Sequence, residues 1–489
     1  MLKPSLLCKI LYKYIWEVIL EKLGKQTIKF NSPPTIVECA SIVGPKEADG
    51  PLAKFFDQTL EDEFWGEKTW EKAESKIIKE TVNMVISKAG ISSSDIDCIF
   101  AGDLLNQCIS SSFGLRELNI PFFGVFGACS TFVESLCLGS ICVEGFAKNV
   151  LCATSSHFCS AEKQFRFPLE LGNQRPPSSQ WTVTGSGSAI LSKTGNGPFI
   201  THITPGKIVD MGIKDANNMG AAMAPSLVDT LITHFKDTGR SPNYYDAIIS
   251  GDLGHIGKEI AIDLCKTNGY NIKNNYNDCG VLIFDKNTQD THSGGSGCAC
   301  CGTVFSGYLF KQLKQKNIKR LLLIATGALT NSTTNQQGES IPGIAHAISI
   351  ELERNWIIMA NINWANVFSF MPLLKCFIVG GLICVIGQIL IDKTKLTPAK
   401  ILVVFVTLGA ILGGLGIYQY LVDFAGAGAT VPLTGFGYNL AKGAIEGVRE
   451  YGLVGAFTGG IKNAAGGIAA AIFFGYIASL ISKPKMKKQ

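Results

Sequence analysis

Hydrophobic and polar positions divide the chain into two regions with different patterns. Between about residues 24 and 351, short apolar runs of strand character alternate with helix-like runs, such as the helical pattern at 69–88 before the apolar run at 97–104. Such alternation is typical of mainly parallel sheets covered by helices. From about residue 372 onward, long uncharged runs replace it. The pattern therefore predicts an α/β domain at 24–351, a connector at 352–371 and an all-α transmembrane domain at 372–489.

Three uncharged stretches of the last region are long enough to cross a membrane, because about 20 helical residues span a ~30 Å hydrocarbon core. They are residues 376–391 with the preceding Leu373 and Leu374, residues 401–422, and residues 463–482. The glycine pairs at 413–414 and 466–467 favour close helix packing and assembly with other spans. Residues 424–437 are uncharged but rich in glycine and proline. They leave two interpretations open, a re-entrant or pore-lining segment and a simple loop.

The number of crossings stays open between three and four. The N-terminal region has no uncharged core of signal-peptide length, so we expect the α/β domain on the cytosolic side. Three spans would then place the four lysines of the last seven residues outside, against the positive-inside tendency. A fourth crossing near Glu446, Arg449 and Glu450 would restore that tendency.

The two flanking segments are less informative. Residues 1–23 predict an amphipathic helix whose apolar face is interrupted by Lys9, Lys13 and Glu17. It would lie on a membrane surface or on the next domain, or form a loosely held terminus. In the connector, Trp356 and Trp364 suit either an interfacial anchor or packing on the α/β domain.

Charge follows the same division. The chain carries a formal net charge of +5, and the part from Leu373 onward carries +7. A basic excess confined to the membrane region indicates a membrane-adjacent tail and argues against nucleic-acid binding. The 16 cysteines are scattered, mostly within apolar runs, which favours reduced thiols over disulfides. The cluster at 298–301 lacks a second Cys/His pair at zinc-site spacing, so a metal centre is not favoured there.

The α/β region contains an internal duplication. The run Asp-Cys-Ile-Phe-Ala-Gly-Asp-Leu at 97–104 returns as Asp-Ala-Ile-Ile-Ser-Gly-Asp-Leu at 246–253. Residues 127–130 have a weaker counterpart at 297–300, and 151–155 return at 323–327. The three markers occur in the same order in both halves. We therefore predict two similar α/β halves.

Cys129 is the candidate functional residue of the first half. An apolar run with strand character at 120–126 leads into it, and a helix-like run at 132–146 leaves it. The first amide groups of a helix are unpaired and its dipole is positive there, which favours a thiolate or a bound anion. The alternative interpretation is a small buried residue in a tight turn.

These features resemble the thiolase fold, which has this duplication. The Gly-Ala-Cys-Ser string at 127–130 resembles the nucleophile turn of the condensing enzymes of fatty-acid synthesis, and the glycine-rich run at 181–191 resembles the strand that closes their first half. The strings at 44–52, 101–107, 153–157 and 294–300 resemble the stage V sporulation protein AD (SpoVAD) family. The resemblance implies an internally duplicated, five-layered thiolase-like fold over 24–351 and a role in binding dipicolinic acid.

The condensing-enzyme resemblance implies a cysteine with His/Asn or His/His partners. Those partners are missing at the matched positions, where Gly251-Asp252 and the Gly-Gly-Ser-Gly string at 294–297 stand instead. We therefore expect a binding pocket with no catalytic residues. His157 is either a partner of Cys129 or a hydrogen-bonded wall residue. The expected ligand-binding residues are Cys129, Ser155, Ser156, His157 and Asp103.

No cofactor is expected, and Ca²⁺ enters only as calcium dipicolinate. Asp103 and Asp252 stand at equivalent strand ends, where they would either reach that Ca²⁺ or cap turns.

The C-terminal region resembles the stage V sporulation protein AE (SpoVAE) family through the strings at 379–388, 395–398 and 423–432. A fusion of these two families would fix binder and membrane unit at one-to-one and raise their effective concentration. The resemblance implies a multi-pass subunit of a SpoVA-type channel in the inner membrane of the forespore or spore, whose partners are dipicolinic acid, the lipid bilayer and other SpoVA-type subunits. The alternatives are a membrane-tethered condensing enzyme or acyltransferase that uses Cys129, and a scaffold with a vestigial pocket.

Overall fold

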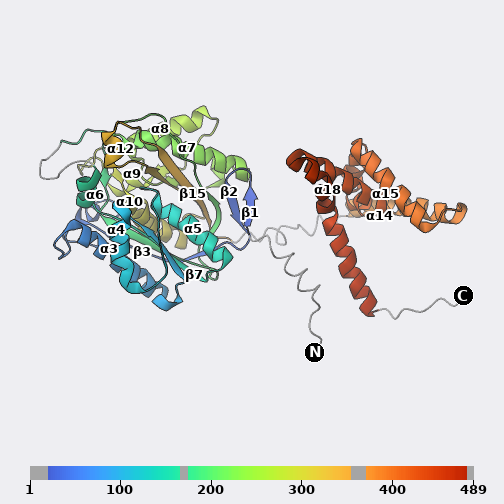
Figure 1. Ribbon diagram of the computed structural model, residues 1–489, viewed down its shortest axis with the longest axis horizontal. Helices are drawn as coiled ribbons and strands as arrows, with labels where there is room; N and C mark the ends of the chain where they lie inside the picture. Colours follow the sequence, from blue (N-terminus) through green and yellow to red (C-terminus); the bar gives the residue numbers. More distant parts are fainter. Residues whose placement is uncertain (1–19, 166–173, 354–369, 482–489) are drawn as a thin grey trace. The chain divides into compact units, whose positions relative to one another are not determined.

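The computed structural model describes residues 20–165, 174–353 and 370–481 and divides the chain into two compact units, Met1–Asn355 and Trp356–Gln489 (Figure 1). The first unit is built on a long mixed sheet path. In spatial order its strands are β12 (Tyr276–Asp278), β11 (Ala247–Ser250), β14 (Arg320–Ala328), β15 (Gly343–Glu351), β10 (Phe199–Thr204), β3 (Thr35–Val43), β9 (Gly185–Ser192), β7 (Asn149–Ser156), β5 (Cys98–Gly102) and β6 (Phe122–Gly124).

This path falls into two halves with the same internal pattern. In one half β5 runs parallel to β6 and β7, and β9 then runs antiparallel to both β7 and β3. In the other half β11 runs parallel to β12 and β14, and β15 runs antiparallel to both β14 and β10. Between β10 and β3 the register contains the single pair Phe199 and Thr35. The predicted duplication is confirmed, and the two halves are in effect two sheets.

Equivalent residues of the halves have equivalent roles. The Asp97 carboxylate accepts the amides of Lys148 and Asn149, at 2.6 and 3.0 Å. The Asp246 carboxylate accepts the amides of Lys319 and Arg320, at 2.8 and 2.9 Å. Each aspartate thus ties the start of one strand to the start of its parallel neighbour.

Alternation of side chains along the strands produces the layers, because successive residues face opposite sides of a sheet. Val150 and Cys152 of β7 join the core around Phe132 of helix α5 (Thr131–Gly145), whereas Leu151 joins the core around helix α3 (Trp70–Ala89). In the second sheet, Leu321, Leu323 and Ala325 of β14 face the α5 core. Leu322 and Ile324 face helix α7 (Met219–Thr238).

Helix α5 therefore lies between the sheets and contacts both. Helix α3 covers one outer face, while α7 and helix α8 (Gly254–Thr267) cover the other (Figure 1). The α-β-α-β-α arrangement agrees with the five-layered thiolase-like fold that we expected.

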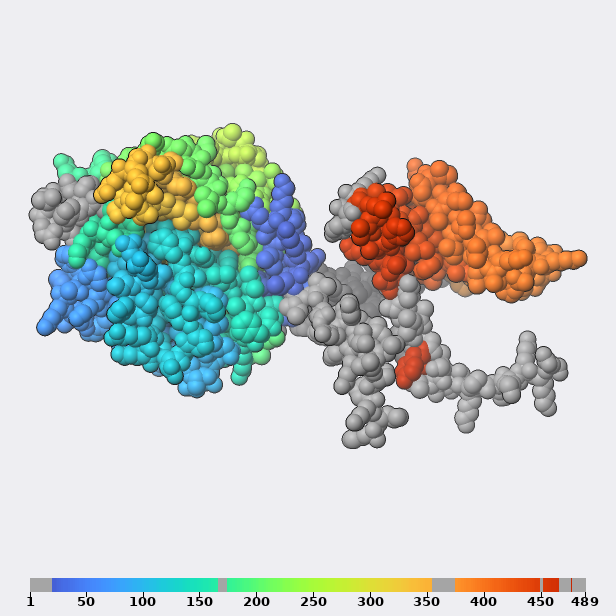
Figure 2. Space-filling view, in the orientation of Figure 1, coloured from blue at the N-terminus to red at the C-terminus, as the bar shows by residue number. Residues whose placement is uncertain are grey.

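The N-terminal prediction was wrong where the structure describes it. Leu20–Leu23 form strand β1, which pairs antiparallel with β2 (Thr27–Phe30) rather than ending a helix. The Asp237 carboxylate accepts the amides of Lys25, Gln26 and Thr27 at 2.9–3.0 Å and fixes the turn between these strands. β2 also pairs with β10, so the hairpin extends the second sheet at its edge. Figure 2 shows this N-terminal part of the first unit, in dark blue, at the surface. The rest of the predicted helix, residues 1–19, lies outside the described residues.

The second unit is helical. Helix α14 (Phe370–Lys393) contains an apolar stretch, Leu374–Lys393, that is long enough to cross a membrane, as predicted. The predicted span at 401–422 is not one straight helix. Helix α15 (Pro398–Gly414) and helix α16 (Tyr418–Ala425) occupy it and are bent by 99° at the break, where Gly416 has φ of 76°. By length and composition, the described residues of this unit thus hold one span, or two if the bent pair counts as one.

The segment at 424–437 is neither an open loop nor extended. It contains the end of α16, helix α17 (Ala427–Thr430) and the start of helix α18 (Leu433–Ile481). α18 includes most of the predicted span at 463–482 and is interrupted at Gly452, which has φ of 60° and ψ of −141°. Across that break Gly443 faces Gly459 and Gly447 faces Gly455, so closely that a Cβ at any of them would overlap main-chain atoms. The two parts of α18 therefore pack backbone against backbone.

Of the glycine pair at 413–414, only Gly413 lies at a close helix contact. A Cβ on Gly413 would meet Tyr438 of α18 at 3.0 Å, whereas Gly414 has open space around it. The closest approach of α15 to α18 lies at Gly409, against the main chain of Thr434, and at Gly437, against Val406.

Candidate functional site

Cys129 stands in a tightly constrained turn before α5. Ala128 has φ of 51°, a left-handed conformation that costs a residue other than glycine of order 1 kcal/mol. The Ser130 hydroxyl donates to the Gly127 carbonyl at 2.7 Å, and the Thr131 hydroxyl donates to the Ala128 carbonyl at 2.5 Å. The turn is therefore held by side chains of its own first helical residues.

Three polar side chains from the second half surround the thiol. Cys129 Sγ lies 3.7 Å from Ser296 Oγ, and Ser296 donates to Asp252 Oδ2 at 3.4 Å. The Thr326 hydroxyl donates to Asp252 Oδ1 at 2.6 Å, and the Asp252 carboxyl also interacts with the thiol. These residues stand at the ends of β11, β13 (Gly295–Ser296) and β14. The duplicated topology thus brings residues at strand ends of the second half to the first half's cysteine.

The electrostatics of this site favour a buried thiol at Cys129 over the alternative of a thiolate. Burial raises the pKa of Cys129 well above its usual value, and the negative charge of Asp252 raises it further. Burial also raises the pKa of Asp252 to about 7, against the hydrogen bond from Thr326. Desolvation and the neighbouring carboxylate therefore outweigh the helix dipole, and the thiol stays protonated at neutral pH.

A narrow cavity of about 50 Å³ opens beside the thiol. It is lined by Leu104, Phe126, Ala128, Cys129, Ala161, Glu162, Phe165, Thr182, Met219, Met223, Ser296, Ala328 and Thr330. Its walls are mostly apolar, and these lining residues include one acid, Glu162, and no lysine, arginine or histidine.

Of the five predicted ligand-binding residues, Cys129 alone lines this cavity. Ser155 donates to Glu74 at 3.1 Å, and Ser156 donates to the Val183 carbonyl at 2.7 Å. His157 Nε2 lies 2.8 Å from the Glu63 carbonyl, and Nδ1 accepts the Cys159 amide at 3.2 Å. Burial lowers the pKa of His157. Its geometry is that of a neutral wall residue with both ring nitrogens engaged by groups other than Cys129.

Asp103 caps the turn after β5. Its carboxylate accepts the Leu105 amide at 2.9 Å and both the amide and the hydroxyl of Ser111 at 2.7 Å. Asp103 and Asp252 stand at equivalent positions, but Asp103 serves its own loop while Asp252 faces the cysteine. Among the residues that the structure describes, no group of three or more His, Cys, Asp or Glu side chains is placed to hold a metal ion.

Thr326 and Glu162 are site residues that sequence reasoning missed. Thr326 lies inside the repeated marker at 323–327, so its position at a strand end was already available from the duplication. Glu162 follows from no motif, because it reaches the cavity from helix α6 (Phe158–Phe165).

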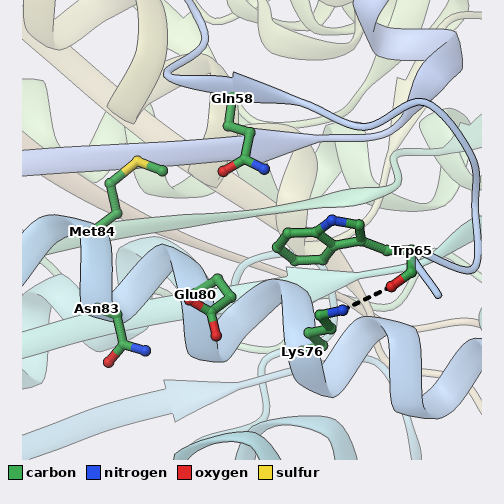
Figure 3. A pocket seen from close by; sticks show the side chains of 6 residues that line it. All are labelled: Gln58, Trp65, Lys76, Glu80, Asn83 and Met84. Carbon is green, nitrogen blue, oxygen red and sulfur yellow. Dashed lines mark hydrogen bonds between the residues drawn. The ribbon is translucent and has the colours of Figure 1, made fainter. Parts of the chain in front are cut away.

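A different hollow of the first unit, shown in Figure 3, lies between α3 and the loop that carries Trp65. Its volume is about 260 Å³. The Lys76 ammonium lies 4.7 Å from the centre of the Trp65 ring and donates to the Trp65 carbonyl at 2.8 Å. The cation of this pocket is thus engaged by the protein itself. We assign the pocket a structural role, holding the Trp65 loop against α3.

Buried carboxyl groups make the first unit sensitive to alkaline pH. Burial raises the pKa of Glu47 to about 8 and that of Asp252 to about 7, and burial with the nearby Asp103 raises the pKa of Glu74. A raised folded-state pKa means that the folded protein holds protons that the unfolded chain releases, so stability falls as pH rises toward the folded pKa. Below about pH 6.5 the buried histidines oppose this trend, since burial lowers the pKa of His234 to about 3.

We therefore expect the first unit to lose about 3 kcal/mol of stability between pH 6.5 and 8.5. Chemical unfolding of the detergent-solubilised chain at constant ionic strength would measure the loss. Glu47→Gln removes one of the titrating groups and should flatten the slope. Equal stability at both pH values would contradict the assignment.

Comparison with known proteins gives two matches along the chain. The model of the stage V sporulation protein AD (SpoVAD) family matches residues 24–351. The model of the SpoVAC/SpoVAEB sporulation membrane protein family matches residues 372–481. The expected SpoVAE-type region is thus matched by a family that combines SpoVAC with SpoVAEB.

Curated relatives agree with this division. Stage V sporulation protein AD of Bacillus subtilis (strain 168) is 44% identical over 329 residues, which cover 67% of this chain and 97% of the relative. Stage V sporulation protein AC of the same organism is 37% identical over 117 residues, 22% of this chain and 77% of the relative.

Solved structures are more distant. 3-Oxoacyl-[acyl-carrier-protein] synthase III from Aquifex aeolicus VF5 is 14% identical, with a TM-score of 0.42 over 65% of this chain and 99% of that one. A histidine-to-asparagine variant of Xanthomonas campestris OleA is 12% identical, with a TM-score of 0.43 over 68% of this chain and 100% of that one. The sequence relatives decide the assignment: the chain belongs to the stage V sporulation protein AD family over its first unit and joins to it a sporulation membrane domain of the SpoVAC/SpoVAEB family.

Proposed function

We propose that this sporulation membrane protein binds dipicolinate in the cavity beside Cys129, as its calcium chelate, and acts in its passage across the inner membrane of the forespore as a multi-pass subunit of a SpoVA-type channel. The observation that carries the ligand is the lining of the cavity. Apolar walls with a few fixed polar groups suit a flat aromatic ring. Hydroxyl groups of Thr182, Ser296 and Thr330 offer hydrogen bonds to its carboxylates.

The charge of the site favours the chelate over the free dianion. Glu162 lines the cavity and Asp252 lies behind Ser296, whereas no basic side chain lines it among the residues that the structure describes. Two carboxylates of a free ligand would be repelled by these acids, and the low local dielectric increases that cost. A one-to-one calcium chelate carries no net charge, and its Ca²⁺ accepts oxygen ligands such as carboxylates.

The cavity must widen to admit this ligand, since about 50 Å³ holds only a few water molecules. Met219 and Met223 at the start of α7 line it. Methionine side chains are unbranched and adapt their shape at low cost. We assign these two residues the role of adjustable walls.

The membrane unit supports the transport part of the proposal. It contains the apolar helix α14 and the bent pair α15 and α16, and it shares one chain with the binding unit. Covalent linkage keeps bound ligand at high effective concentration near the membrane helices.

Cys129→Ala is expected to weaken binding of calcium dipicolinate about fivefold to tenfold, because the ligand loses packing against the thiol in a desolvated site. Calorimetric titration of the detergent-solubilised full chain, with and without calcium, would measure this change. Cys265→Ala is the matched control, since that thiol is buried in the separate core beneath α7 and α8. Affinity equal to that of the unmodified protein would remove the cavity as the binding site.

We infer that Cys129 serves binding rather than acyl transfer. A raised thiol pKa disfavours the nucleophilic thiolate. Ser296 and Asp252, not an imidazole and an amide, lie beside the sulfur. A stable acyl adduct on Cys129 after incubation with acyl-CoA thioesters, seen by mass spectrometry, would contradict this inference and favour the condensing-enzyme alternative.

A further inference from the structure

The first unit has another open groove, of about 670 Å³. Its lining is polar and includes basic side chains, whereas the lining of the Cys129 cavity is mostly apolar and includes an acid. Three segments form it: Pro177, the start of α8 at His255 and Ile256, and the loop 286–293. Basic side chains converge here, namely His255, Lys286 and His292. This is the size range of small-ligand pockets.

The positive charge of the groove that no acid among the described residues offsets is that of Lys286. In the part of the chain that the structure describes, the Lys286 ammonium and the His255 ring make no hydrogen bond or ion pair. Burial, together with the positive charges of Lys286 and Lys258, lowers the pKa of His255 against the negative charge of Glu259, so its ring is a neutral hydrogen-bond donor at neutral pH. Asp290 is the acid of the groove, and the Arg175 guanidinium, 3.0 Å from its Oδ2, neutralises it. His292 Nε2 lies 3.5 Å from the other oxygen of Asp290. The groove therefore has a positive excess.

The loop that presents Lys286 is held in place on both sides. The Asp285 carboxylate accepts the amides of Asn287 and Thr288 at 2.7 and 3.2 Å. The Gln289 side chain accepts the Asp285 amide at 2.9 Å and donates to the Lys46 carbonyl at 2.7 Å. A ligand would thus meet side chains on a preorganised loop, which lowers the entropy lost on binding.

The first amides of α8 do not contribute to this site. The His255 amide donates to the Ser293 carbonyl at 2.7 Å, and the Ile256 amide donates to the Ser293 hydroxyl at 3.3 Å. Recognition of an anion in the groove depends on side chains, and these can be replaced one at a time.

We propose that this groove is a second ligand site, separate from the Cys129 cavity, and that it binds small dianionic dicarboxylates. The Lys286 ammonium pairs with one carboxylate, and the imidazole N–H groups of His255 and His292 donate to the other. The site goes beyond the proposed function, since it takes the free dianion that the acidic cavity repels.

Isophthalate tests the groove, because it has the same carboxylate spacing as dipicolinate but lacks the ring nitrogen needed to chelate calcium tightly. Calorimetry on the detergent-solubilised full chain in EDTA would use isophthalate and free dipicolinate as probes. Lys286→Gln is expected to weaken both about tenfold, since a charge-assisted hydrogen bond is lost. His255→Gln should act in the same direction.

Lys266→Gln is the matched control, because it removes the same charge from an exposed position at the other end of α8. Cys129→Ala should leave isophthalate binding unchanged. The proposal is overturned if the unmodified protein binds neither probe, if Lys286→Gln binds as the unmodified protein does, or if Lys266→Gln loses as much affinity. Binding of isophthalate without any binding of calcium dipicolinate would support the groove and reject the proposed function of the cavity.

Discussion

Replacing Gly187 with alanine is expected to destabilise the first unit by about 3 kcal/mol, a large part of the ~5–15 kcal/mol by which an ordinary domain is stable. Gly187 lies on β9, directly against the main chain of Gly302 in helix α10 (Cys298–Thr303). A Cβ there would overlap backbone atoms, which cannot rotate away as a side chain can. The whole central helix layer would have to move. The midpoint of chemical unfolding of the detergent-solubilised chain would report the loss.

Gly145→Ala is the matched control for this substitution. Gly145 is the last residue of α5, and no atom lies within 4 Å of the position that its Cβ would take. Because alanine favours helices more than glycine does, this variant should be neutral or slightly stabilising. Equal stability of the two variants would show that α10 does not press on β9 as closely as described.

Arg240→Ala is expected to lower the free energy of unfolding of the first unit by about 3–5 kcal/mol, because it removes the cation that is paired with the buried carboxylate of Glu351. The Arg240 guanidinium lies 2.8 Å from Glu351 Oε1, and the two side chains are only 12% and 4% exposed. The hydroxyl groups of Thr201 and Tyr244 also donate to Glu351, at 2.7 and 3.0 Å. This network closes the end of β15, the last strand before the connector.

Thermal unfolding of the full chain would measure the effect, with Lys207→Ala as the control for loss of a surface ion pair. Lys207 lies 3.0 Å from Asp229 but is 59% exposed, so its removal should cost less than about 1 kcal/mol. The double variant Arg240→Met, Glu351→Met should recover part of the loss, because it removes the unpaired charge with the pair. No difference between Arg240→Ala and Lys207→Ala would contradict a buried role for the pair.

The duplicated fold could be predicted because its signals are local. Asp97 and Asp246 each precede an apolar run that ends in Gly-Asp-Leu. In the structure these two runs form the strands β5 and β11. The hairpin at Leu20–Leu23 could not be predicted in this way. Its four residues fit a helix or a strand equally well, and Asp237, more than 200 residues away, decides the turn. The bend after α15 could not be predicted either, because Leu415 to Ile417 are uncharged and do not interrupt the apolar pattern.

The site was only partly predictable. The turn at Cys129 follows from the change between strand and helix patterns, but the directions of neighbouring side chains do not. Ser155 and Ser156 are adjacent in sequence, yet one turns to Glu74 on the α3 side and the other to Val183. The thiol's partners come from the second half, and only the packing of α5 between the sheets brings them there. Burial keeps the Cys129 thiol protonated, and no sequence motif indicates how deeply this residue is buried.

The two sheets share a single backbone pair, Phe199 with Thr35. The halves are otherwise joined by the apolar core around α5, by the parallel pair of β8 (Trp181–Thr182) with β13, and by α10 packed against β9. Cys129 belongs to the first half and Asp252 to the second, so a ligand that fills the space beside them contacts both halves of the unit at once.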